Sequence, residues 1–401
     1  MIHGRGFLIG MLVAGVLAVA LALLAAGGQG AQATDGILYV DADAPGANDG
    51  TSWWDAFLEL YDALAVAGSG DQIWVAEGTY KPTDGSDRAA SFQMVNGVAI
   101  YGGFDPSVGD IEWEDRDWVQ NVTILSGDLD GDDIPPFGNN VENSYHVFHH
   151  PAGTALDSSA ILDGFTISGG SADGAYPYDR GGGMANDESS PTLSNVTFWG
   201  NSAAAGGGMA NDDSSPRLSN CTFADNSTSS GGGGMYNWHS SPVLTGCTFS
   251  ANWAAAGGGG IYNGDGSAPT LNNCTFAENT TDQAGGGMLN SSSSPTLTGC
   301  TFSGNSATGS GGGMTNYFSS PALTGCTFVD NSTNGGGGGM IYRDSMPTLT
   351  DCTFTSNSAG YGGGIYNFEN AAPVLDRCIF ADNTANSSGG GMYNVDGSSP
   401  A

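Results

Sequence analysis

Residues 218–226 read Leu-Ser-Asn-Cys-Thr-Phe-Ala-Asp-Asn, and a closely similar segment returns in each later repeat of the chain. Every repeat continues through a few small residues into a Gly-Gly-Gly-(Met/Ile) run and then a turn. The cysteine recurs at intervals of 26, 27, 26, 26, 26 and 26 residues. Its positions are Cys221, Cys247, Cys274, Cys300, Cys326, Cys352 and Cys378. Such a regular period predicts stacked structural units, each of which forms one coil.

Two further motifs keep the same period. The Phe-x-x-Asn motif begins at Phe198, Phe223, Phe249, Phe276, Phe302, Phe328, Phe354 and Phe380. The Gly-Gly-Gly-(Met/Ile) motif ends at Met184, Met209, Met235, Ile261, Met288, Met314, Met340, Ile365 and Met392. The columns that these motifs form are expected to run along the length of the stack.

Short strands are the only regular structure that fits one repeat. No repeat holds ten or more good helix formers at a spacing of 3.6 residues, which excludes helical solenoids. Each repeat has one leucine where a leucine-rich repeat has several. Strands that return after a full circuit pair in parallel, and their crossover is right-handed. The sequence therefore predicts an all-β fold, a right-handed parallel β-helix, with coils ~4.8 Å apart in a rod of roughly 40 Å.

Residues 1–33 have the pattern of a signal peptide. Arg5 precedes an apolar run over residues 7–26, and Ala31-Gln32-Ala33 precedes the expected cleavage point. A retained membrane anchor is the alternative, but the Ala-x-Ala motif favours cleavage. No later segment is long and apolar enough to span a membrane. We therefore expect a secreted or outer-surface protein without membrane insertion by this chain.

Residues 34–150 lack the repeat and are predicted to form an N-terminal cap followed by irregular first coils. Residues 55–67 alone have helical periodicity, with Thr51 or Ser52 as N-cap. The apolar face of this predicted helix consists of Phe57, Leu60, Tyr61 and Leu64. We expect this helix to close the mouth of the coil. Residues 72–76, 98–101 and 122–125 are predicted strands.

Residues 151–401 contain the regular repeats of about 26 residues. The first regular coil is expected at residues 161–167, where Phe165 takes the place of the cysteine. The last residues, 398–401, begin another coil without finishing it. We therefore expect the protein to continue into further coils or an anchoring domain.

The charge of the chain is strongly negative. Aspartate and glutamate number 41 against 8 lysines and arginines, for a net charge of −33. Such a chain repels nucleic acids and anionic lipids. We therefore expect no nucleic-acid partner, and cations or neutral molecules as ligands.

The seven cysteines are predicted to be buried free thiols. Stacked side chains ~4.8 Å apart lie farther from each other than the roughly 3.8 Å between the Cβ atoms of a relaxed disulfide. Val196 takes the eighth place in the column, which indicates a small apolar site. Disulfides and a zinc site are the alternatives; no histidine accompanies the column to support zinc.

The repeated asparagines and glycines are predicted to serve the fold. The asparagine of Phe-x-x-Asn ends a strand and can bond its neighbours in adjacent coils. Some of these asparagines also fall in glycosylation triplets, such as Asn226-Ser227-Thr228. The Gly-Gly-Gly run has neither the lysine nor the following helix of a phosphate loop, so tight turns explain it better.

The repeats resemble those of the polymorphic outer membrane proteins, over roughly residues 165–394. The segments that carry the resemblance are Phe-Ala-Asp-Asn, Phe-Ser-Gly-Asn and Gly-Gly-Gly-Met-Tyr-Asn, which are similar to the Phe-x-x-Asn and Gly-Gly-Ala-(Ile/Leu/Val) motifs of that family. This resemblance implies a pectate-lyase-like β-helix at a bacterial surface, often an adhesive passenger of a C-terminal β-barrel. The chain departs from the pattern by a third glycine in place of alanine.

Two classes of function remain open. The first is a structural or adhesive role, with a carbohydrate or a host or cell-surface protein as partner. The second is a polysaccharide lyase or glycoside hydrolase, which needs two or three placed carboxylates, or a base beside bound calcium. The sequence shows no carboxylate pair and no base that breaks the repeat, so we predict no catalytic residues and no organic cofactor. The expected class is therefore a binding protein rather than an enzyme.

One insertion interrupts the repeats, at residues 171–180. It offers Asp173, Tyr176, Tyr178, Asp179 and Arg180 as a possible ligand loop. A simple surface excursion is the alternative. These five residues are the candidate binding residues of the repeat region.

An acidic segment provides a candidate calcium site. Asp128, Asp130, Asp132 and Asp133 place carboxylates as a calcium loop does, but Asn139 stands where a closing glutamate is expected. A transition-metal site at His146, His149 and His150 is not expected, because a strand over residues 145–148 sends His146 and His149 to opposite faces. Calcium is therefore the only metal that the sequence suggests.

Two columns of the repeats are predicted to face solvent. Trp238, Tyr317 and Phe368 share one position and form a sugar-stacking stripe or scattered exposed aromatics. The position two residues after each phenylalanine carries an acid in every second coil: Asp225, Glu278, Asp330 and Asp382. This alternation keeps like charges roughly 9.6 Å apart, about one Debye length.

Overall fold

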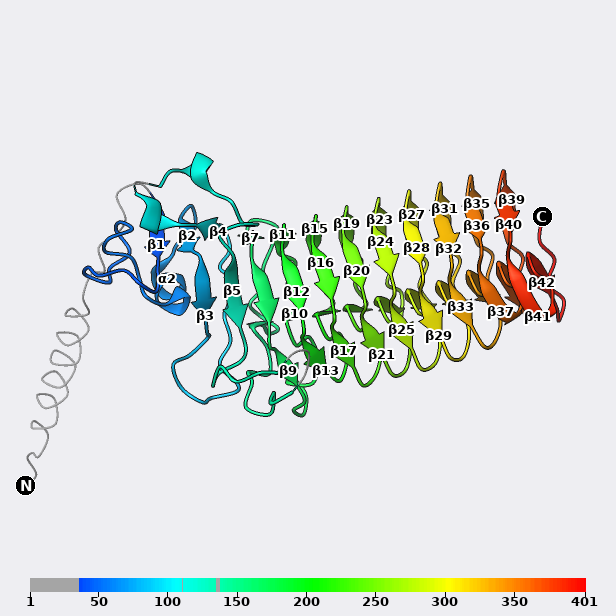
Figure 1. Ribbon diagram of the computed structural model, residues 1–401, viewed down its shortest axis with the longest axis horizontal. Helices are drawn as coiled ribbons and strands as arrows, with labels where there is room; N and C mark the ends of the chain where they lie inside the picture. The colour runs from blue at the N-terminus through cyan, green and yellow to red at the C-terminus, as the bar shows by residue number, and fades with distance from the viewer. Residues whose placement is uncertain (1–35, 110, 135–137) are drawn as a thin grey trace, which may run out of the picture.

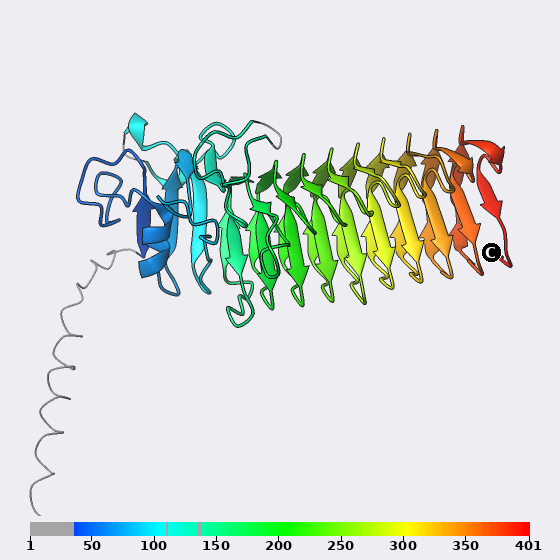
Figure 2. The ribbon, with the colours of Figure 1, turned by 90° about the horizontal axis from the view of Figure 1, so that it is seen from below.

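The computed structural model describes residues 36–109, 111–134 and 138–401. The predicted signal peptide lies outside these ranges. The chain winds into a right-handed parallel β-helix that forms one elongated rod (Figures 1 and 2). Each regular coil contributes one strand to each of four parallel sheets, in the chain order sheet 1, sheet 2, sheet 3, sheet 4. The predicted fold class is confirmed.

The sheets consist of twelve, eleven, nine and ten strands. Sheet 1 contains β1 (Ile37–Val40), β2 (Gln72–Ala76), β4 (Ala99–Phe104), β7 (Ile161–Asp163), β11 (Thr192–Ser194), β15 (Arg217–Ser219), β19 (Val243–Thr245), β23 (Thr270–Asn272), β27 (Thr296–Thr298), β31 (Ala322–Thr324), β35 (Thr348–Thr350) and β39 (Val374–Asp376). Sheet 2 contains β3 (Gly78–Tyr80), β5 (Thr123–Ser126), β8 (Thr166–Ser168), β12 (Thr197–Trp199), β16 (Thr222–Ala224), β20 (Thr248–Ser250), β24 (Thr275–Ala277), β28 (Thr301–Ser303), β32 (Thr327–Val329), β36 (Thr353–Thr355) and β40 (Ile379–Ala381).

Sheet 3 contains β9 (Ser171–Ala172), β13 (Ser202–Ala203), β17 (Ser227–Thr228), β21 (Trp253–Ala254), β25 (Thr280–Thr281), β29 (Ser306–Ala307), β33 (Ser332–Thr333), β37 (Ser358–Tyr361) and β41 (Thr384–Ser388). Sheet 4 contains β6 (Phe148–His150), β10 (Met184–Asp187), β14 (Met209–Asp212), β18 (Met235–Trp238), β22 (Ile261–Gly264), β26 (Met288–Ser291), β30 (Met314–Tyr317), β34 (Met340–Arg343), β38 (Ile365–Phe368) and β42 (Met392–Asn394). Strands β1 to β6 join the same sheets as the repeats, so residues before 151 form the first coils as well as the end of the rod.

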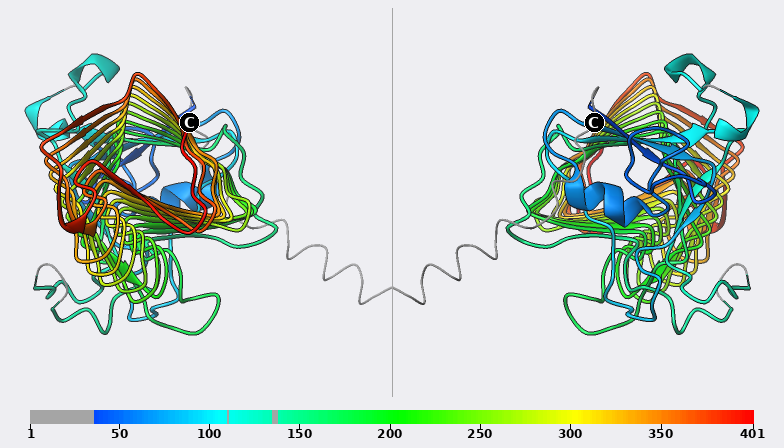
Figure 3. Two further views of the ribbon diagram at one scale, coloured as in Figure 1. Left: turned by 90° about the vertical axis from the view of Figure 1, so that its right-hand side faces the viewer. Right: turned by 90° about the vertical axis from the view of Figure 1, so that its left-hand side faces the viewer.

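One short helix covers the N-terminal end of the rod, as Figure 3 shows. This helix, α2 (Leu60–Val66), is shorter than the predicted helix over residues 55–67, and its N-cap is Glu59 rather than Thr51 or Ser52. The reason is local: Phe57 is extended and pairs with Val40 of β1. Leu60 and Ala63 are buried in the main core, so the predicted closure of the coil is confirmed. Two 3-10 turns, η1 (Pro106–Val108) and η2 (Trp113–Asp115), lie on a loop that projects from the first coils.

The interior is built from columns of identical side chains. Successive phenylalanine rings of the Phe-x-x-Asn motif stack with centroids 4.4–5.0 Å apart and planes within 7° of parallel. The cysteine column lies beside them, and Phe165 and Val196 continue it toward the N-terminus, as predicted. All seven cysteines are free thiols, and six are buried. The column therefore packs as a row of small hydrophobic groups.

The asparagine of Phe-x-x-Asn is the buried corner between sheets 2 and 3. Asn226 Nδ2 donates to Asn252 Oδ1 at 3.0 Å and to the carbonyl oxygen of Phe198 at 2.9 Å. The backbone N–H of Asn226 donates to the same Asn252 Oδ1 at 3.1 Å. The pattern repeats from Asn201 to Asn383. The predicted bonding between coils is confirmed.

The glycine runs are required by close approach of the coils. Gly206 has φ +67°, a left-handed conformation that suits glycine. A Cβ atom on Gly207 or Gly208 would lie 2.5–2.6 Å from a carbonyl oxygen of a neighbouring coil. Tight-turn geometry thus explains the first glycine, and contact between coils explains the second and third.

The column two residues after each phenylalanine is a left-handed corner. All eight residues have φ between +53° and +66°. They are Gly200, Asp225, Ala251, Glu278, Gly304, Asp330, Ser356 and Asp382. The four acids are exposed and stack in register, as predicted. These positions must therefore tolerate a left-handed backbone as well as keep like charges apart.

The histidine segment differs from its prediction. The strand is β6 (Phe148–His150), not residues 145–148. His150 pairs with Asn186 of β10, so it takes the first place in the inner asparagine column of sheet 4. Its Nδ1 lies 2.8 Å from Asn186 Oδ1, and its Nε2 accepts the Met94 N–H at 3.2 Å. Burial lowers the pKa of His150 to about 4, although the bond to Asn186 opposes this shift.

Thiol labelling tests the cysteine column. In a chain ending at Ala401, we expect one thiol, Cys378, to react with a disulfide reagent under native conditions, because only Cys378 is partly exposed. All seven should react after denaturation without reductant. The Cys378→Ser variant should show no rapid native reaction. Fewer than seven thiols in the denatured chain would contradict the free column.

Acid should weaken the N-terminal coils. The pKa values of His146 and His150 are lowered to about 4 by burial, so their neutral forms stabilise the fold fully above about pH 6.5. That contribution is lost as the pH falls from about 6.5 toward 4. We expect His150→Asn to reduce the loss of unfolding free energy between about pH 7.5 and about pH 5, measured by denaturant titration.

Asn237→Ala provides the control for this comparison, because it changes a buried position of the same column without removing a titratable group. It should lower the unfolding free energy by the same amount at both pH values. An unchanged pH dependence in His150→Asn would show that another group governs acid sensitivity.

Candidate functional site

The outer face of sheet 4 varies from coil to coil, whereas its inner face repeats the same residues apart from Phe148, His150 and Tyr342. The first and third residues of each strand point inward, and methionine or isoleucine alternates there with buried asparagine. The fourth residues form an outer column in strict register: Asp187, Asp212, Trp238, Gly264, Ser291, Tyr317, Arg343 and Phe368. This column contains the three aromatic residues that the sequence analysis placed together.

Three aromatic rings form a platform near the middle of this face. The rings of Tyr236 and Tyr262 stack with centroids 5.1 Å apart, and the Trp238 ring lies parallel to Tyr236 within 1°. A Cβ atom on Gly264 would lie only 2.8 Å from Trp238 Cε3. The half-buried indole therefore packs against the backbone at Gly264. We call Tyr236, Trp238 and Tyr262 the aromatic platform.

The inserted segment begins later than predicted, because Ser171 and Ala172 form β9 of sheet 3. The residues of this segment contact different parts of the fold. Asp173 forms an ion pair with Arg88 at 2.7 Å, and that arginine packs on the Tyr145 ring. The side-chain Oδ1 of Asp179 is buried without a partner, and its carbonyl accepts the N–H of Ala204 at 2.9 Å. The loop is thus held to the coils at several points.

Tyr178 of the insertion joins a ring cluster with the histidine segment. Its ring stacks on Tyr145 at 5.0 Å and lies 5.9 Å from His146 and 6.1 Å from His149. The rings of His146 and His149 are 4.7 Å apart, so the prediction that they face opposite sides was wrong. The error follows from the strand, which starts only at Phe148. Burial lowers the pKa of both histidines, so both rings are neutral near pH 7.

Arg180 brings the insertion to the edge of the platform. Its guanidinium lies 3.4 Å from Asp212 Oδ2, and its Cζ lies 5.7 Å from the centre of the Tyr236 ring. Tyr176, which is 68% exposed, and Arg180 line a pocket with His149, Asp187 and Asp212. The predicted loop residues Tyr176 and Arg180 therefore meet at one place, beside the aromatic platform.

Asp187 and Asp212 form a pair of carboxylates that the sequence analysis did not identify. They lie opposite each other on β10 and β14. Burial raises the pKa of Asp212, and Asp187 adds to that effect while Arg180 opposes it. The prediction that the chain has no carboxylate pair was therefore wrong. The signal was the Met-Ala-Asn-Asp segment in two successive repeats, because no other repeat has an acid at this position.

The face continues as a groove beyond the platform. An open groove of about 500 Å³ has Tyr262, Leu289 and Tyr317 on its floor. The loops between sheets 3 and 4 form its wall, through Ala256, Gln283, Ala284 and Ser310. Phe368 lies two coils beyond Tyr317 in the same outer column. The polar pocket, the platform and the groove thus follow one another along the rod axis.

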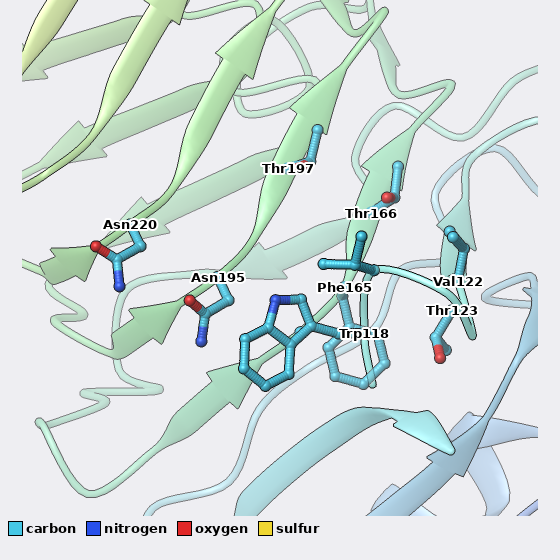
Figure 4. A pocket seen from close by; sticks show the side chains of 10 residues that line it. Trp118, Val122, Thr123, Phe165, Thr166, Asn195, Thr197 and Asn220 are labelled. Atoms are coloured by element: carbon cyan, nitrogen blue, oxygen red, sulfur yellow. The ribbon is translucent and has the colours of Figure 1, made fainter. Parts of the chain in front are cut away.

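A second cleft lies between the projecting loop and sheets 1 and 2. It has a volume of about 290 Å³ and is lined by Trp118, Val122, Thr166, Asn195 and Asn220, among others. Figure 4 shows the indole of Trp118 beside Asn195, in a row that continues to Asn220. Trp118 is 40% exposed. None of the described residues that line this cleft is charged.

Arg116 fixes the loop that carries Trp118. Its side chain is 5% exposed and forms an ion pair with Asp163 at 2.9 Å. Its Nε donates to the carbonyl oxygen of Gly102 at 2.6 Å. The guanidinium also lies 4.8 Å from the centre of the Trp118 ring. This cleft is therefore a rigid feature of the first coils.

The acidic segment folds back on Asp128. Asp128 Oδ1 accepts the N–H of Gly131 at 2.6 Å, and its Oδ2 accepts the N–H of Asp133 at 3.2 Å. One side-chain oxygen from each of Asp128, Asp132 and Glu142 lies within 4.8 Å of the others. Asp130 is exposed and lies outside this group. Glu142 was missed because a loop separates it from the aspartates in the sequence.

Burial and neighbouring charge act together on Asp133. Burial raises its pKa, a bond from Asn143 opposes this, and Asp128, Glu142 and Asp132 raise it further. The segment is therefore a concentrated negative site next to the first coils.

Across the part of the chain that the structure describes, no helix combines the length and the apolar character needed to span a membrane.

Several solved structures align with the chain. Pectate lyase Pel9A aligns with 11% identity and a TM-score of 0.41, over 88% of this chain and 78% of that chain. The gp42 tailspike of Acinetobacter phage vb_AbaP_AS12 aligns with 13% identity and a TM-score of 0.46, over 82% of this chain and 57% of that chain. The gp49 tailspike of Acinetobacter baumannii bacteriophage Fri1, a capsular polysaccharide depolymerase, aligns with 12% identity and a TM-score of 0.37, over 80% and 63%.

No curated protein matches the chain significantly. The family described as the right-handed beta helix region matches residues 111–276, 189–337 and 229–385. These overlapping segments cover more than half of the chain. The protein therefore belongs to the right-handed β-helix family.

Proposed function

We propose that the protein binds a neutral glycan along the outer face of sheet 4. The observation that carries this proposal is the aromatic platform, in which Trp238 packs against Gly264 beside the stacked rings of Tyr236 and Tyr262. Half-buried aromatic rings with a few polar groups nearby suit the apolar faces and hydroxyls of sugars. Arg180 lies 5.7 Å from the centre of the Tyr236 ring, and the His239 ring lies 5.4 Å from the Trp238 ring, so polar groups adjoin this platform.

The charge of the chain favours a neutral glycan over an acidic one. The net charge is −33, and Asp187 and Asp212 stand at one end of the platform. Arg180 is the cation at that end, and it already forms an ion pair with Asp212. A uronate chain would therefore meet repulsion with little compensation. Neutral sugars bind without that cost.

The biological setting that we propose is the cell surface. The predicted signal peptide and the repeats similar to those of polymorphic outer membrane proteins support secretion and an adhesive or envelope role. A long rod with one binding face suits attachment to glycans of a host or a neighbouring cell. Detection of the protein in the medium or on intact cells by antibody labelling tests this location, and a purely intracellular signal would contradict it.

Replacement of Trp238 tests the binding face. We expect at least one neutral polysaccharide, such as xylan, glucomannan or β-glucan, to retard the chain in affinity electrophoresis, whereas pectate and alginate do not. Trp238→Ala should weaken that binding roughly tenfold, because aromatic stacking contributes about 0.5–1.5 kcal/mol beyond buried area.

Trp253→Ala is the matched control for this test. Trp253 lies on β21 of sheet 3 and is 38% exposed, so its loss should leave binding unchanged. Equal weakening by both substitutions, or none by Trp238→Ala, would count against the platform.

Hydrolysis of a glycan is the second candidate function. Two facing carboxylates suit an acid and a base or nucleophile, and the raised pKa of Asp212 suits the acid. In this mechanism Asp212 donates a proton to the leaving oxygen, and Asp187 activates water or attacks the sugar. A lyase reaction is less favoured, because it needs a base placed beside an acidic sugar.

Product analysis separates these activities. We expect no unsaturated ends from pectate or alginate after prolonged incubation with the purified chain. If a bound neutral glycan yields reducing ends, Asp212→Asn should abolish the release and Asp213→Asn should not, because Asp213 is an exposed corner residue. Unsaturated products that survive in Asp212→Asn would contradict this assignment.

A further inference from the structure

The acidic segment has the geometry of a cation site that differs from the one read from the sequence. One side-chain oxygen from each of Asp128, Asp132 and Glu142 lies within 4.8 Å of the other two. Oxygens that share one calcium ion at bond lengths of about 2.4 Å lie no more than about 4.8 Å apart. The three oxygens are therefore close enough to one another to share one calcium ion.

Buried oxygen atoms beside this group lack partners. Asp133 Oδ1, Glu142 Oε1 and Asn143 Oδ1 are buried and accept no hydrogen bond. Asn143 is 1% exposed, and its Nδ2 donates to Asp133 Oδ2 at 2.8 Å and to the carbonyl oxygen of Gly169 at 2.7 Å. Those two bonds use both amide hydrogens and fix the amide beside Asp133, while its Oδ1 stays buried without a donor. A buried acceptor without a donor is costly.

No protein cation compensates this group. Among residues 36–109, 111–134 and 138–401, none of these carboxylates forms an ion pair with lysine or arginine. The nearby Lys81 uses its Nζ to donate to the carbonyl oxygen of Leu129 at 2.9 Å. Several carboxylates with unpartnered oxygens thus face one another across a short distance, and only a bound cation or proton can relieve their repulsion.

We propose that Asp128, Asp132, Glu142 and Asn143 bind one calcium ion, with Asp133 adjoining it. All the donors are oxygen atoms, which calcium prefers. Glu142 provides the closing carboxylate ligand that Asn139 cannot provide, and Asp130 does not bind the ion. The ion ties the loop after β5 to the segment that enters β6. Because Asn143 also bonds Gly169, occupancy fixes this segment against the coil that follows β8.

Calorimetry on the full chain tests the site with calcium chloride as the titrant. We expect one calcium ion per chain, with binding in the micromolar to millimolar range typical of extracellular sites, and a melting temperature that rises with calcium concentration. Magnesium chloride at the same concentration should bind more weakly. Glu142→Gln should weaken calcium binding at least tenfold and remove most of the rise in melting temperature.

Asp130→Asn is the matched control, since it removes the same charge from the same loop without touching the group. It should bind calcium as the parent chain does. If Glu142→Gln fails to fold, Asp132→Asn tests the same site from an exposed position. The absence of calcium heat in the parent chain, or an equal loss in Asp130→Asn, would overturn the proposal in favour of a protonated carboxyl or a diffuse ion atmosphere.

Discussion

Stacking in register imposes one condition on the buried corner asparagines of the repeats: each must bond its own copy in the next coil. The asparagine at the corner between sheets 2 and 3 meets this condition completely. Asn252 Oδ1 accepts two bonds from Asn226, and its Nδ2 donates to Asn279 and to the carbonyl oxygen of Phe223. A primary amide offers two donors and two acceptor sites, so nothing is left unpaired. A shorter or longer side chain would break this chain of bonds in both directions.

The same condition separates constant from variable positions. Residues at the corners must adopt a left-handed conformation or leave room for the backbone of a neighbouring coil. Side chains in the core columns must have the same size in each coil. The fourth position of each sheet 4 strand meets neither demand, because its side chain points outward. Its sequence runs through acid, tryptophan, glycine, serine, tyrosine and arginine. Recognition can therefore change at this position without cost to the fold.

The repeats were predictable because each position is restated many times. The period, the phenylalanine and cysteine columns, and the asparagine corner all follow from that redundancy. The first coils lack it, and there the errors accumulate. Pairing of Phe57 with Val40 shortened the helix, and the late start of β6 brought His146 beside His149. Glu142 and Asp133 come together only through the loop between them, a contact that no local spacing encodes.

The candidate sites lie where repeating and non-repeating segments meet, and this placement has a physical basis. A solenoid coil offers rigid, evenly spaced positions but few ways to concentrate charge, because an identical charge would recur at every coil. Arg180 and His149 come from segments outside the period, whereas Asp212 and Trp238 come from regular strands. The coils thus supply a fixed floor, and the irregular segments supply the few charged groups that can orient a ligand on it. A binding site made only of repeats would lack this polarity, and one made only of loops would lack the rigid spacing along the rod.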